Sequence, residues 1–254
     1  MEINKIYCGN CIKGMKKFDE DCIDMVVTSP PYNLGKDYGD RVNDSVAFDD
    51  YHTFAINIMR ESYRIMKDGG RFCLEMGGSG RNFPLTWCWQ DAAFRAGFGL
   101  YSEITITHRK TNECAWGSWL KADNVYTIPN FHMAYVFYKG NETKRGKTEI
   151  TPKQFSEWTR GRWTLNFARR VTKHPAEYPV ELVLRFMKLF GHAGDLIMDP
   201  FMGSGTTAVA AKVLNRKYIG FELNPNFVAM AERRLLQEYM WKWENNKPKK
   251  IEDW

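Results

Sequence analysis

The 254-residue sequence predicts an α/β fold with a mostly parallel sheet and an antiparallel edge. Two observations support this prediction. Short apolar segments typical of strands alternate with amphipathic segments typical of helices, and this alternation favours parallel strands joined by helical connections. Two strand-like segments, 101–108 and 132–138, then have no helix-like segment between them, which indicates an antiparallel pair at one edge of the sheet.

The first half of the chain contains three strand-like and three helix-like segments ahead of that pair. Strands are expected at 5–7, 23–27 and 71–76, where the residues are mostly apolar or β-branched. Helices are expected at 11–18, 51–67 and 85–96, and Gly69 and Gly97 mark the ends of the second and third. Residues 116–119, between the two adjacent strands, are expected to form a loop.

The second half returns to the alternating pattern. A helix is expected at 174–190, with a proline-rich beginning and Gly191 after its end. A strand, a glycine-rich turn and a helix are expected between 195 and 214. A strand at 217–221 and a last helix from about 225 to 241 follow.

The segment 139–173 differs from the rest of the chain in charge. It holds ten basic and three acidic residues, a net charge of +7 against +6 for the whole chain. Trp158, Trp163 and Phe167 lie among them, and basic side chains interleaved with aromatic rings are typical of nucleic-acid surfaces. A solvated loop with a few anchoring aromatic residues is the alternative. The candidate DNA-binding residues are Lys144, Arg145, Lys147, Arg160, Arg162, Arg169 and Arg170.

The overall composition is that of a globular, mildly basic protein. A hydrophobic fraction of 44% supports a sizeable core, and a pI near 8.9 favours a polyanionic partner. Cys8 and Cys11 have CxxC spacing, but no second pair follows at the spacing of a zinc site, so we expect no metal. There is no signal peptide and no apolar run long enough to span a membrane, so we expect a cytoplasmic protein.

Thr28-Ser29-Pro30-Pro31-Tyr32 is the first of two segments that indicate chemistry. Two prolines after the strand at 23–27 impose a rigid turn, because proline fixes φ and has no N–H. The carbonyl groups of Ser29 and Pro30, with the Ser29 hydroxyl, are then acceptors at fixed positions beside the Tyr32 ring. Such a site suits a planar group that carries an NH2, such as a nucleobase with an exocyclic amine. A tight structural turn is the alternative.

The second segment is Asp199–Thr207, between a strand and a helix. It has neither the Walker pattern nor GxGxxG, but Gly203 and Gly205 let a ligand approach the backbone, and the helix that follows offers free N–H groups. Glu222, at the end of the next strand, is placed to accept hydrogen bonds from ribose hydroxyls. The pattern favours a nucleoside ligand, and a solvent-exposed acid is the alternative for Glu222.

These two segments, in this order, resemble those of the β group of amino-directed DNA methyltransferases, the site-specific modification methylases. Asp199-Pro200-Phe201-Met202-Gly203-Ser204-Gly205-Thr206 is similar to the S-adenosylmethionine motif DPFxGSGT, and Thr28–Tyr32 resembles the catalytic motif. The segment 174–190 is similar to the helix before the cofactor motif. Cys8–Cys11 resembles a GDC segment whose Asp contacts the cofactor adenine, with Asn10 in place of that Asp. The resemblance covers most of residues 5–240.

The resemblance implies a Rossmann-like, seven-stranded sheet and S-adenosylmethionine as the cofactor. The cofactor-binding residues would be Asn10, Asp199, Pro200, Phe201, Gly203, Ser204, Gly205, Thr206 and Glu222. The catalytic residues would be Ser29, Pro30, Pro31 and Tyr32. The chain would divide into a catalytic part at 1–138, a basic target-recognition insertion at 139–173, a cofactor-binding part at 174–241 and a polar tail at 242–254.

The expected reaction is methyl transfer to an exocyclic amine of a base flipped out of double-stranded DNA. Ser29 and the Pro30 carbonyl would accept hydrogen bonds from the amine, and Tyr32 would stack on the base. Many adenine-N6 enzymes of the family have Asp or Asn at the position of Ser29, so Ser29 favours cytosine N4. Asn33 also occurs among adenine enzymes and keeps adenine N6 open.

Three hypotheses and a set of partners accompany this one. A methyltransferase acting on RNA, one acting on a protein amide, and a non-catalytic DNA-binding module are the competing functions. The resemblance implies a restriction–modification system in a prokaryote or phage, so a cognate restriction endonuclease is a candidate partner. Both a monomer and a homodimer agree with the sequence.

Overall fold

The computed structural model describes residues 2–39, 44–77, 84–108, 116–117, 125–126, 131–143, 145–165, 174–236, 243–244 and 247–248. The strands of the main sheet are β1 (Lys5–Cys8), β2 (Ile23–Thr28), β3 (Met66–Gly77), β4 (Gly99–His108), β7 (Phe131–Tyr138), β8 (Arg162–Leu165), β9 (Leu196–Asp199) and β10 (Lys217–Glu222). The helices are α1 (Cys11–Met15), α2 (Phe48–Ile65), α3 (Leu85–Ala96), α4 (Pro152–Trp158), α5 (Val180–Phe190), α6 (Thr206–Val213) and α7 (Pro225–Leu236). Two short ladders pair β5 (Trp116–Gly117) with β6 (Val125–Tyr126) and β11 (Trp243–Glu244) with β12 (Lys247–Pro248).

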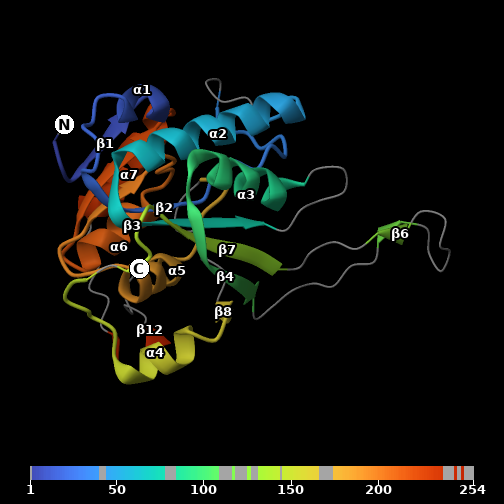
Figure 1. Cartoon of the computed structure of the whole chain (residues 1–254). Coiled ribbons are helices and arrows are strands. Elements are labelled where there is room, and N and C mark those ends of the chain that lie inside the picture. Colours follow the sequence, from blue (N-terminus) through green and yellow to red (C-terminus); the bar gives the residue numbers. More distant parts are fainter. Residues whose placement is uncertain are drawn as a thin grey trace.

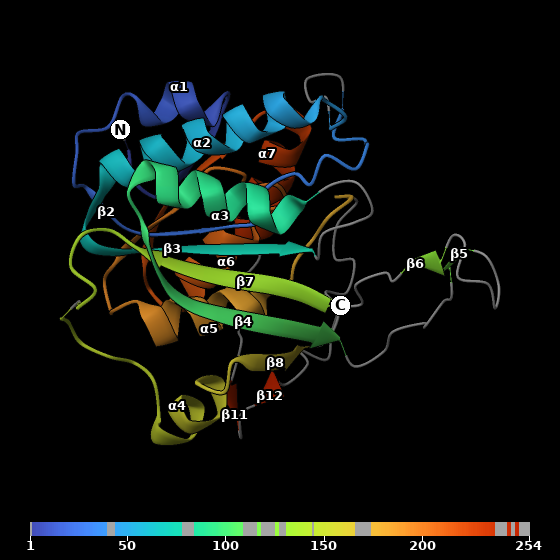
Figure 2. The same ribbon diagram turned by 45° about the vertical axis from the view of Figure 1, so that its right-hand side comes forward.

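The main sheet has the strand order β1-β10-β9-β2-β3-β7-β4-β8 (Figures 1 and 2). Its neighbouring strands are parallel except at β7, which is antiparallel to both β3 and β4. The predicted fold class, a Rossmann-like and mostly parallel sheet with antiparallel pairing near one edge, is therefore confirmed. The sheet has one strand more than the seven expected, because β8 from the basic segment adds to its edge.

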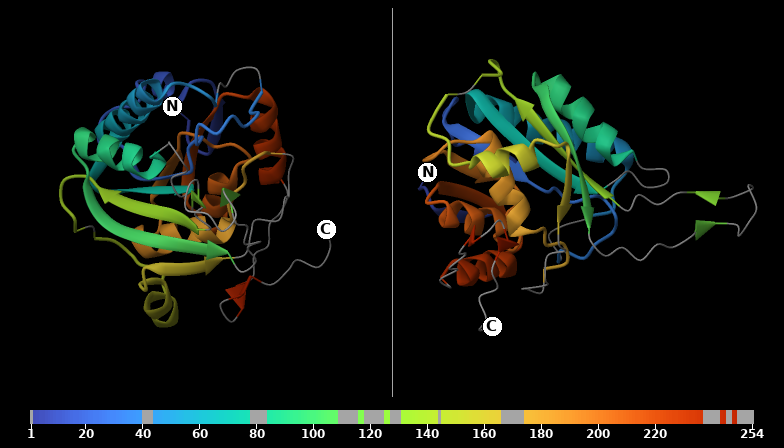
Figure 3. Two further views of the ribbon diagram at one scale, coloured as in Figure 1. Left: turned by 90° about the vertical axis from the view of Figure 1, so that its right-hand side faces the viewer. Right: turned by 90° about the horizontal axis from the view of Figure 1, so that it is seen from below.

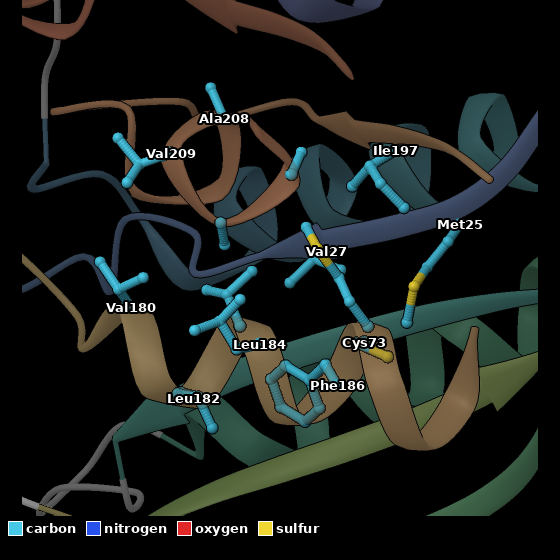
Figure 4. Packing of buried hydrophobic residues seen from close by; sticks show 14 of the residues in the cluster. Met25, Val27, Cys73, Val180, Leu182, Leu184, Phe186, Ile197, Ala208 and Val209 are labelled. Carbon is cyan, nitrogen blue, oxygen red and sulfur yellow. The ribbon is translucent and has the colours of Figure 1, made fainter. Parts of the chain in front are cut away.

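Side chains that alternate along the strands fill two cores, one on each face of the sheet. On one face, residues such as Val26 and Phe72 pack with α1, α2 and α3. On the other, α5, α6 and α7 cover the sheet, so that helices lie on both sides of it (Figure 3). Figure 4 shows the second core, in which Val27 and Cys73 of the sheet lie near Phe186 of α5.

Most predicted elements are present, with differences at their ends. The helix predicted at 51–67 begins at Phe48 and ends at Ile65. Gly69 lies within β3 and is not the helix stop that we predicted. There β3 bulges, since Ile23 pairs with Met66 but Met25 pairs with Arg71. Gly97 does end α3 in the left-handed conformation, with φ of 103°.

Three further expectations meet the structure only in part. Residues 116–117, predicted as loop, pair with β6, while 118–119 lie outside the described residues. The helix predicted at 174–190 begins only at Val180. The last helix is described as far as Leu236, so its predicted end at 237–241 lies outside the described residues.

The basic segment is integrated into the fold where it is described. Trp158 and Trp163, which we predicted to lie on a nucleic-acid surface, are only 2% and 1% exposed, so that prediction is wrong. The Trp163 ring lies 5.6 Å from the ring of Phe186, and the Arg185 guanidinium lies 5.2 Å from the Trp158 ring. These two tryptophans fix α4 and β8 to α5. Phe167 lies outside the described residues.

None of the helices in the described part of the chain is long and apolar enough to cross a membrane.

Candidate active site

The Pro-Pro-Tyr turn and the glycine turn lie side by side, because the strands before them are neighbours. Val26 of β2 pairs with Met198 of β9, so both turns leave the same edge of the sheet. A cavity of about 590 Å³ lies at this edge and is lined by both turns. The predicted site residues that line it are Asn10, Ser29, Pro30, Pro31, Tyr32, Pro200, Phe201, Gly203, Ser204, Thr206 and Glu222.

The helical layer holds the Pro-Pro turn in place. Tyr51 of α2 is 3% exposed, and its hydroxyl donates to the Pro31 carbonyl at 2.6 Å. The same hydroxyl accepts from the indole N–H of Trp89 in α3 at 3.0 Å. The position of the turn therefore depends on two helices as well as on β2.

Asp44 and Asn33 organise the loop after the Pro-Pro turn. The buried Asp44 carboxylate accepts from the N–H groups of Asn33, Leu34 and Lys36 at 2.8, 3.1 and 2.9 Å. The Asn33 amide pairs with the Val46 backbone in both directions, at 2.9 and 2.8 Å. Both ends of the Asn33 side chain are thus engaged in holding the loop.

A buried carboxylate, Glu75, lies behind the Tyr32 side chain. Glu75 is 4% exposed, and its Oε2 accepts from the Tyr32 hydroxyl at 3.1 Å, which lies 3.2 Å from the Ser29 Oγ. Its Oε1 is hydrogen-bonded to Nδ1 of His132 on the neighbouring strand β7. Hydrogen bonds thus connect Ser29, Tyr32, Glu75 and His132 along one wall of the cavity.

The charges of this wall follow from burial and from the pairing of Glu75 with His132. Burial acts to raise the pKa of Glu75, but the hydrogen bond and charge of His132 outweigh it and hold that pKa below its usual value. Burial acts to lower the pKa of His132, and Glu75 holds it above its usual value. Burial raises the pKa of Tyr32 well above its usual value, so its hydroxyl stays protonated. The wall therefore contains an ion pair beside a phenol that donates to the carboxylate.

Glu222 and Gly203 connect β10 with the glycine turn. The Glu222 Oε2 accepts from the Gly203 N–H at 2.9 Å, and its Oε1 accepts from the Asn224 N–H at 2.8 Å. Burial raises the pKa of Glu222. Gly203 has φ of 50°, and a Cβ added there would lie 2.9 Å from Nε2 of His174. Any side chain at this position would meet both strain and a steric clash.

His174 belongs to an extended segment, 174–179, that forms another wall of the cavity. It is 9% exposed, and its Nδ1 accepts from the Ala176 N–H at 3.2 Å. Its ring lies 4.5 Å from that of Phe227 and 6.0 Å from that of Tyr38. Burial lowers the pKa of His174 to about 4, so the ring is neutral at physiological pH, with its proton on Nε2.

Two predicted cofactor ligands, Asp199 and Gly205, do not line the cavity. Gly205 has φ of 84°, and a Cβ added there would lie 2.8 Å from the Cβ of Ala231 in α7. The structure therefore requires glycine at 205 for helix packing, whereas we predicted a close approach to a ligand. Asp199 is fully buried beneath the turn. Asn10 lines the cavity and also caps α1, since its Oδ1 accepts from the Lys13 N–H at 3.0 Å.

The candidate DNA-binding residues do not gather at the cavity where the structure describes them. The Lys147 carbonyl accepts from the Ala193 N–H at 3.0 Å, before the start of β9, while the cavity lies beyond the end of that strand. Arg162 begins β8, which runs parallel to β4, so it too is nearer the opposite edge. Arg145, Lys147, Arg160 and Arg162 are exposed. Lys144, Arg169 and Arg170 lie outside the described residues.

The sequence reasoning missed several residues of the site. Glu75 had a signal, since it is a lone acid inside the apolar segment Phe72–Met76. His132 and Asp44 had none, because only the strand pairing and the loop show their partners. Among the described residues, no group of three or more His, Cys, Asp or Glu side chains is arranged to hold a metal ion.

A Rossmann-like sheet with these two turns around one cavity defines the class, a transferase that accommodates a nucleoside-like ligand at the carboxyl ends of its strands. The sequence matches a family of DNA methylases, N6_N4_Mtase, over residues 23–233. The chain belongs to this family. It is an S-adenosylmethionine-dependent DNA amino-methyltransferase, of the cytosine-N4 or adenine-N6 kind.

Named relatives and solved structures agree with this assignment. The chain is 28% identical over 249 residues to the type II methyltransferase M.HpaI of Haemophilus parainfluenzae, covering 92% of this chain and 75% of that protein. It is 25% identical over 254 residues to the DNA adenine methyltransferase YhdJ of Escherichia coli (strain K12), covering 92% and 83%.

Two solved structures extend the comparison to the fold. A DNA modification methylase from Thermus thermophilus, TTHA0409 complexed with S-adenosyl-L-methionine, has a TM-score of 0.68 and 26% identity, covering 90% of this chain and 93% of that one. The PvuII DNA methyltransferase, described as cytosine-N4-specific, has a TM-score of 0.72 and 21% identity, covering 93% and 87%. The second likeness shows the fold alone.

The residues of the cavity fit S-adenosylmethionine. Gly203 leaves room beside the backbone, and Glu222 has a second lone pair on each oxygen for hydroxyl donors. The Phe201 ring lies beside them. The acids of the lining also favour a positively charged sulfonium group.

Proposed function

We propose that the protein is a site-specific DNA methyltransferase that methylates the exocyclic N4 of cytosine in double-stranded DNA after flipping the base into the cavity. One observation carries the proposal, namely that the Pro-Pro-Tyr turn and the glycine turn line the same cavity of about 590 Å³. A target base and a cofactor can then be held side by side, which turns a bimolecular step into one between oriented neighbours. Flipping costs a few kcal/mol, and stacking on Tyr32 would offset about 1–3 kcal/mol of this.

The cofactor would be held by the glycine turn and by the segments beside it. Glu222 would accept hydrogen bonds from ribose hydroxyls, and Asn10 and Phe201 would border the adenine. When bound, S-adenosylmethionine supplies an electrophilic methyl group. The neutral His174 faces Gly203 from the other side and would help to exclude water from this part of the cavity.

The base would be held by Ser29, the Pro30 carbonyl and Tyr32. Ser29 Oγ lies 3.2 Å from the Tyr32 hydroxyl, which donates to Glu75. If Ser29 donates to Tyr32, its lone pairs remain for the N–H of the target amine, and the Glu75 charge strengthens each bond along the chain. Accepting from the amine shifts electron density towards its nitrogen and aims the nitrogen lone pair at the methyl donor.

The choice of cytosine over adenine rests on Ser29. Asn33, the residue that kept adenine open, is occupied with the backbone of Val46 through both ends of its amide. We therefore assign it no part in choosing the base. The same chemistry on adenine N6 is the alternative, and the likeness to an adenine methyltransferase supports it.

The partners follow from this function. Duplex DNA is the proposed substrate, with phosphate contacts by the basic residues of 139–173, and a cognate restriction endonuclease is a further proposed partner. We propose a cytoplasmic enzyme of a prokaryote or phage, acting without a metal, as a monomer or a homodimer.

Nucleoside analysis by mass spectrometry tests the proposal. The protein is incubated with unmethylated DNA and S-adenosylmethionine, and the DNA is digested to nucleosides. N4-methylcytosine is the expected product. N6-methyladenine would refute the role given to Ser29 while keeping the reaction class. DNA binding without any methylated base would favour a non-catalytic binding module.

A further inference from the structure

The buried carboxylate of Asp199 connects the two turns of the active site. Asp199 ends β9 and is 0% exposed. Its Oδ1 accepts from the Thr28 hydroxyl at 2.7 Å and from the Phe201 N–H at 2.9 Å. Its Oδ2 accepts from the Thr207 hydroxyl at 2.6 Å and from the Tyr178 hydroxyl at 3.0 Å. Each carboxylate oxygen therefore binds two donors.

These four donors belong to four different segments around the cavity. Thr28 directly precedes Ser29, and Phe201 is part of the glycine turn. Tyr178 belongs to the extended wall at 174–179, and Thr207 lies in the first turn of α6. One side chain thus fixes the segment expected to hold the base to the segment expected to hold the cofactor.

Only a carboxylate satisfies this arrangement. A charged carboxylate is an acceptor on both oxygens, whereas an amide would turn two N–H donors towards two of the four donors at Asp199. Hydrogen bonds to a charged acceptor are also shorter and stronger than neutral ones. A hydroxyl lost from one donor would weaken the connection without leaving another donor in its place.

We propose that Asp199 is a positioning residue for methyl transfer, which through Thr28 sets the Pro-Pro turn at its working distance from the glycine turn. This inference rests on the proposed function and departs from the expectation that Asp199 contacts the cofactor. Methyl transfer needs the two reacting atoms in near-attack geometry, and a displacement of about 1 Å costs on the order of 100-fold in rate. Affinity for cofactor and DNA depends on contacts made within each turn, which remain.

The test compares Thr28→Val with Thr28→Ser. Valine has nearly the shape of threonine but no hydroxyl, and serine keeps the hydroxyl. We measure kcat and KM on unmethylated plasmid DNA with S-adenosylmethionine, the dissociation constant of S-adenosylhomocysteine by calorimetry, and the melting temperature. For Thr28→Val we expect kcat to fall about 10- to 100-fold, with KM and the dissociation constant within about 2-fold of wild type. Thr28→Ser should keep kcat within about 3-fold.

A matched control removes a hydroxyl elsewhere. Thr107, whose hydroxyl lies 3.1 Å from that of Thr164 on β8, does not line the cavity, and Thr107→Val should leave kcat unchanged. If Thr28→Val does not fold, Thr207→Val against Thr207→Ser is the second pair.

The outcomes separate the two proposals. Equal kcat for the valine and serine variants, with active wild type, would overturn the positioning role and leave the proposed function intact. A parallel loss of kcat, cofactor affinity and melting temperature would reduce Asp199 to a structural residue and also overturn it. A wild-type protein that binds S-adenosylhomocysteine but methylates no DNA would refute the proposed function, and the positioning role with it.

Discussion

Glu75→Gln tests the wall behind Tyr32. Glutamine has the shape of glutamate, and its carbonyl oxygen can still accept from the Tyr32 hydroxyl. It carries no charge for His132, whose Nδ1 is hydrogen-bonded to Glu75. Because Glu75 is 4% exposed, water can replace little of what is lost. The substitution therefore isolates the charge of one buried carboxylate.

The expected loss of stability is moderate. A hydrogen bond to a charged group contributes about 1.5–3 kcal/mol. The His132 side chain is 37% exposed, and solvent screening places the pair in the lower part of this range. We expect the free energy of unfolding to fall by about 2 kcal/mol in Glu75→Gln.

The pH dependence of this loss has a definite sign. The folded-state pKa of Glu75 is lowered, so its contribution is present above the unfolded value of about 4.3 and is lost as the pH falls further. The folded-state pKa of His132 is raised, so its contribution is present below about 6.5 and is lost as the pH rises through the folded value. The difference between wild type and variant should be largest between about pH 4.3 and 6.5.

Urea unfolding at pH 5.5 and 9 measures this difference, and an NMR titration follows His132 directly. The pKa of His132 should fall in Glu75→Gln. Asp91→Asn is the control, because Asp91 pairs with a different histidine, His52, at 2.8 Å, and it should leave the His132 titration unchanged. An unchanged pKa of His132 in Glu75→Gln would show that the two groups are not an ion pair.

Three further predictions concern single positions. Tyr32→Ala should lower kcat/KM on DNA by about 5- to 150-fold through the lost base stacking of about 1–3 kcal/mol, whereas Tyr32→Phe should keep most of the DNA affinity; full activity in Tyr32→Ala would contradict the stacking role. In wild type, His174 should remove about 3 kcal/mol of stability as the pH falls from 6.5 to 4, because the unfolded chain binds a proton that the folded chain does not; the pH slope measured by urea unfolding should be smaller in His174→Asn. Trp163→Ala should lower the free energy of unfolding by about 3–5 kcal/mol without weakening DNA binding by the folded protein, as gel-shift titration would show.

The sequence predicted best those features that depend on neighbouring residues. Pro30 and Pro31 had to end a strand, and the glycine turn had to join a strand to a helix, so both turns are where we expected them. The sheet then brings them together, since a mostly parallel order puts all strand ends with the same polarity at one edge.

Features that depend on distant partners were harder to predict. The basic charge of 139–173 correctly indicated a surface segment for Arg145 and Arg160, but the same pattern does not show which aromatic rings face inwards. Trp158 and Trp163 are buried because α5 lies under them and Arg185 interacts with both rings. Glu75 likewise acquires its role only when β7 brings His132 beside it.

The charge of the cavity shows how one protein can handle both a polyanion and a cation. The chain has a net charge of +6, yet the cavity lining contains five acids and one lysine, namely Asp44, Asp50, Glu75, Glu177, Glu222 and Lys36. A negative cavity favours a sulfonium and an amine that donates hydrogen bonds, and it repels phosphate. A duplex would therefore be held by basic residues outside the cavity, and only an uncharged base would enter. This separation of charge favours an extruded nucleobase as the group that the Pro-Pro-Tyr turn receives.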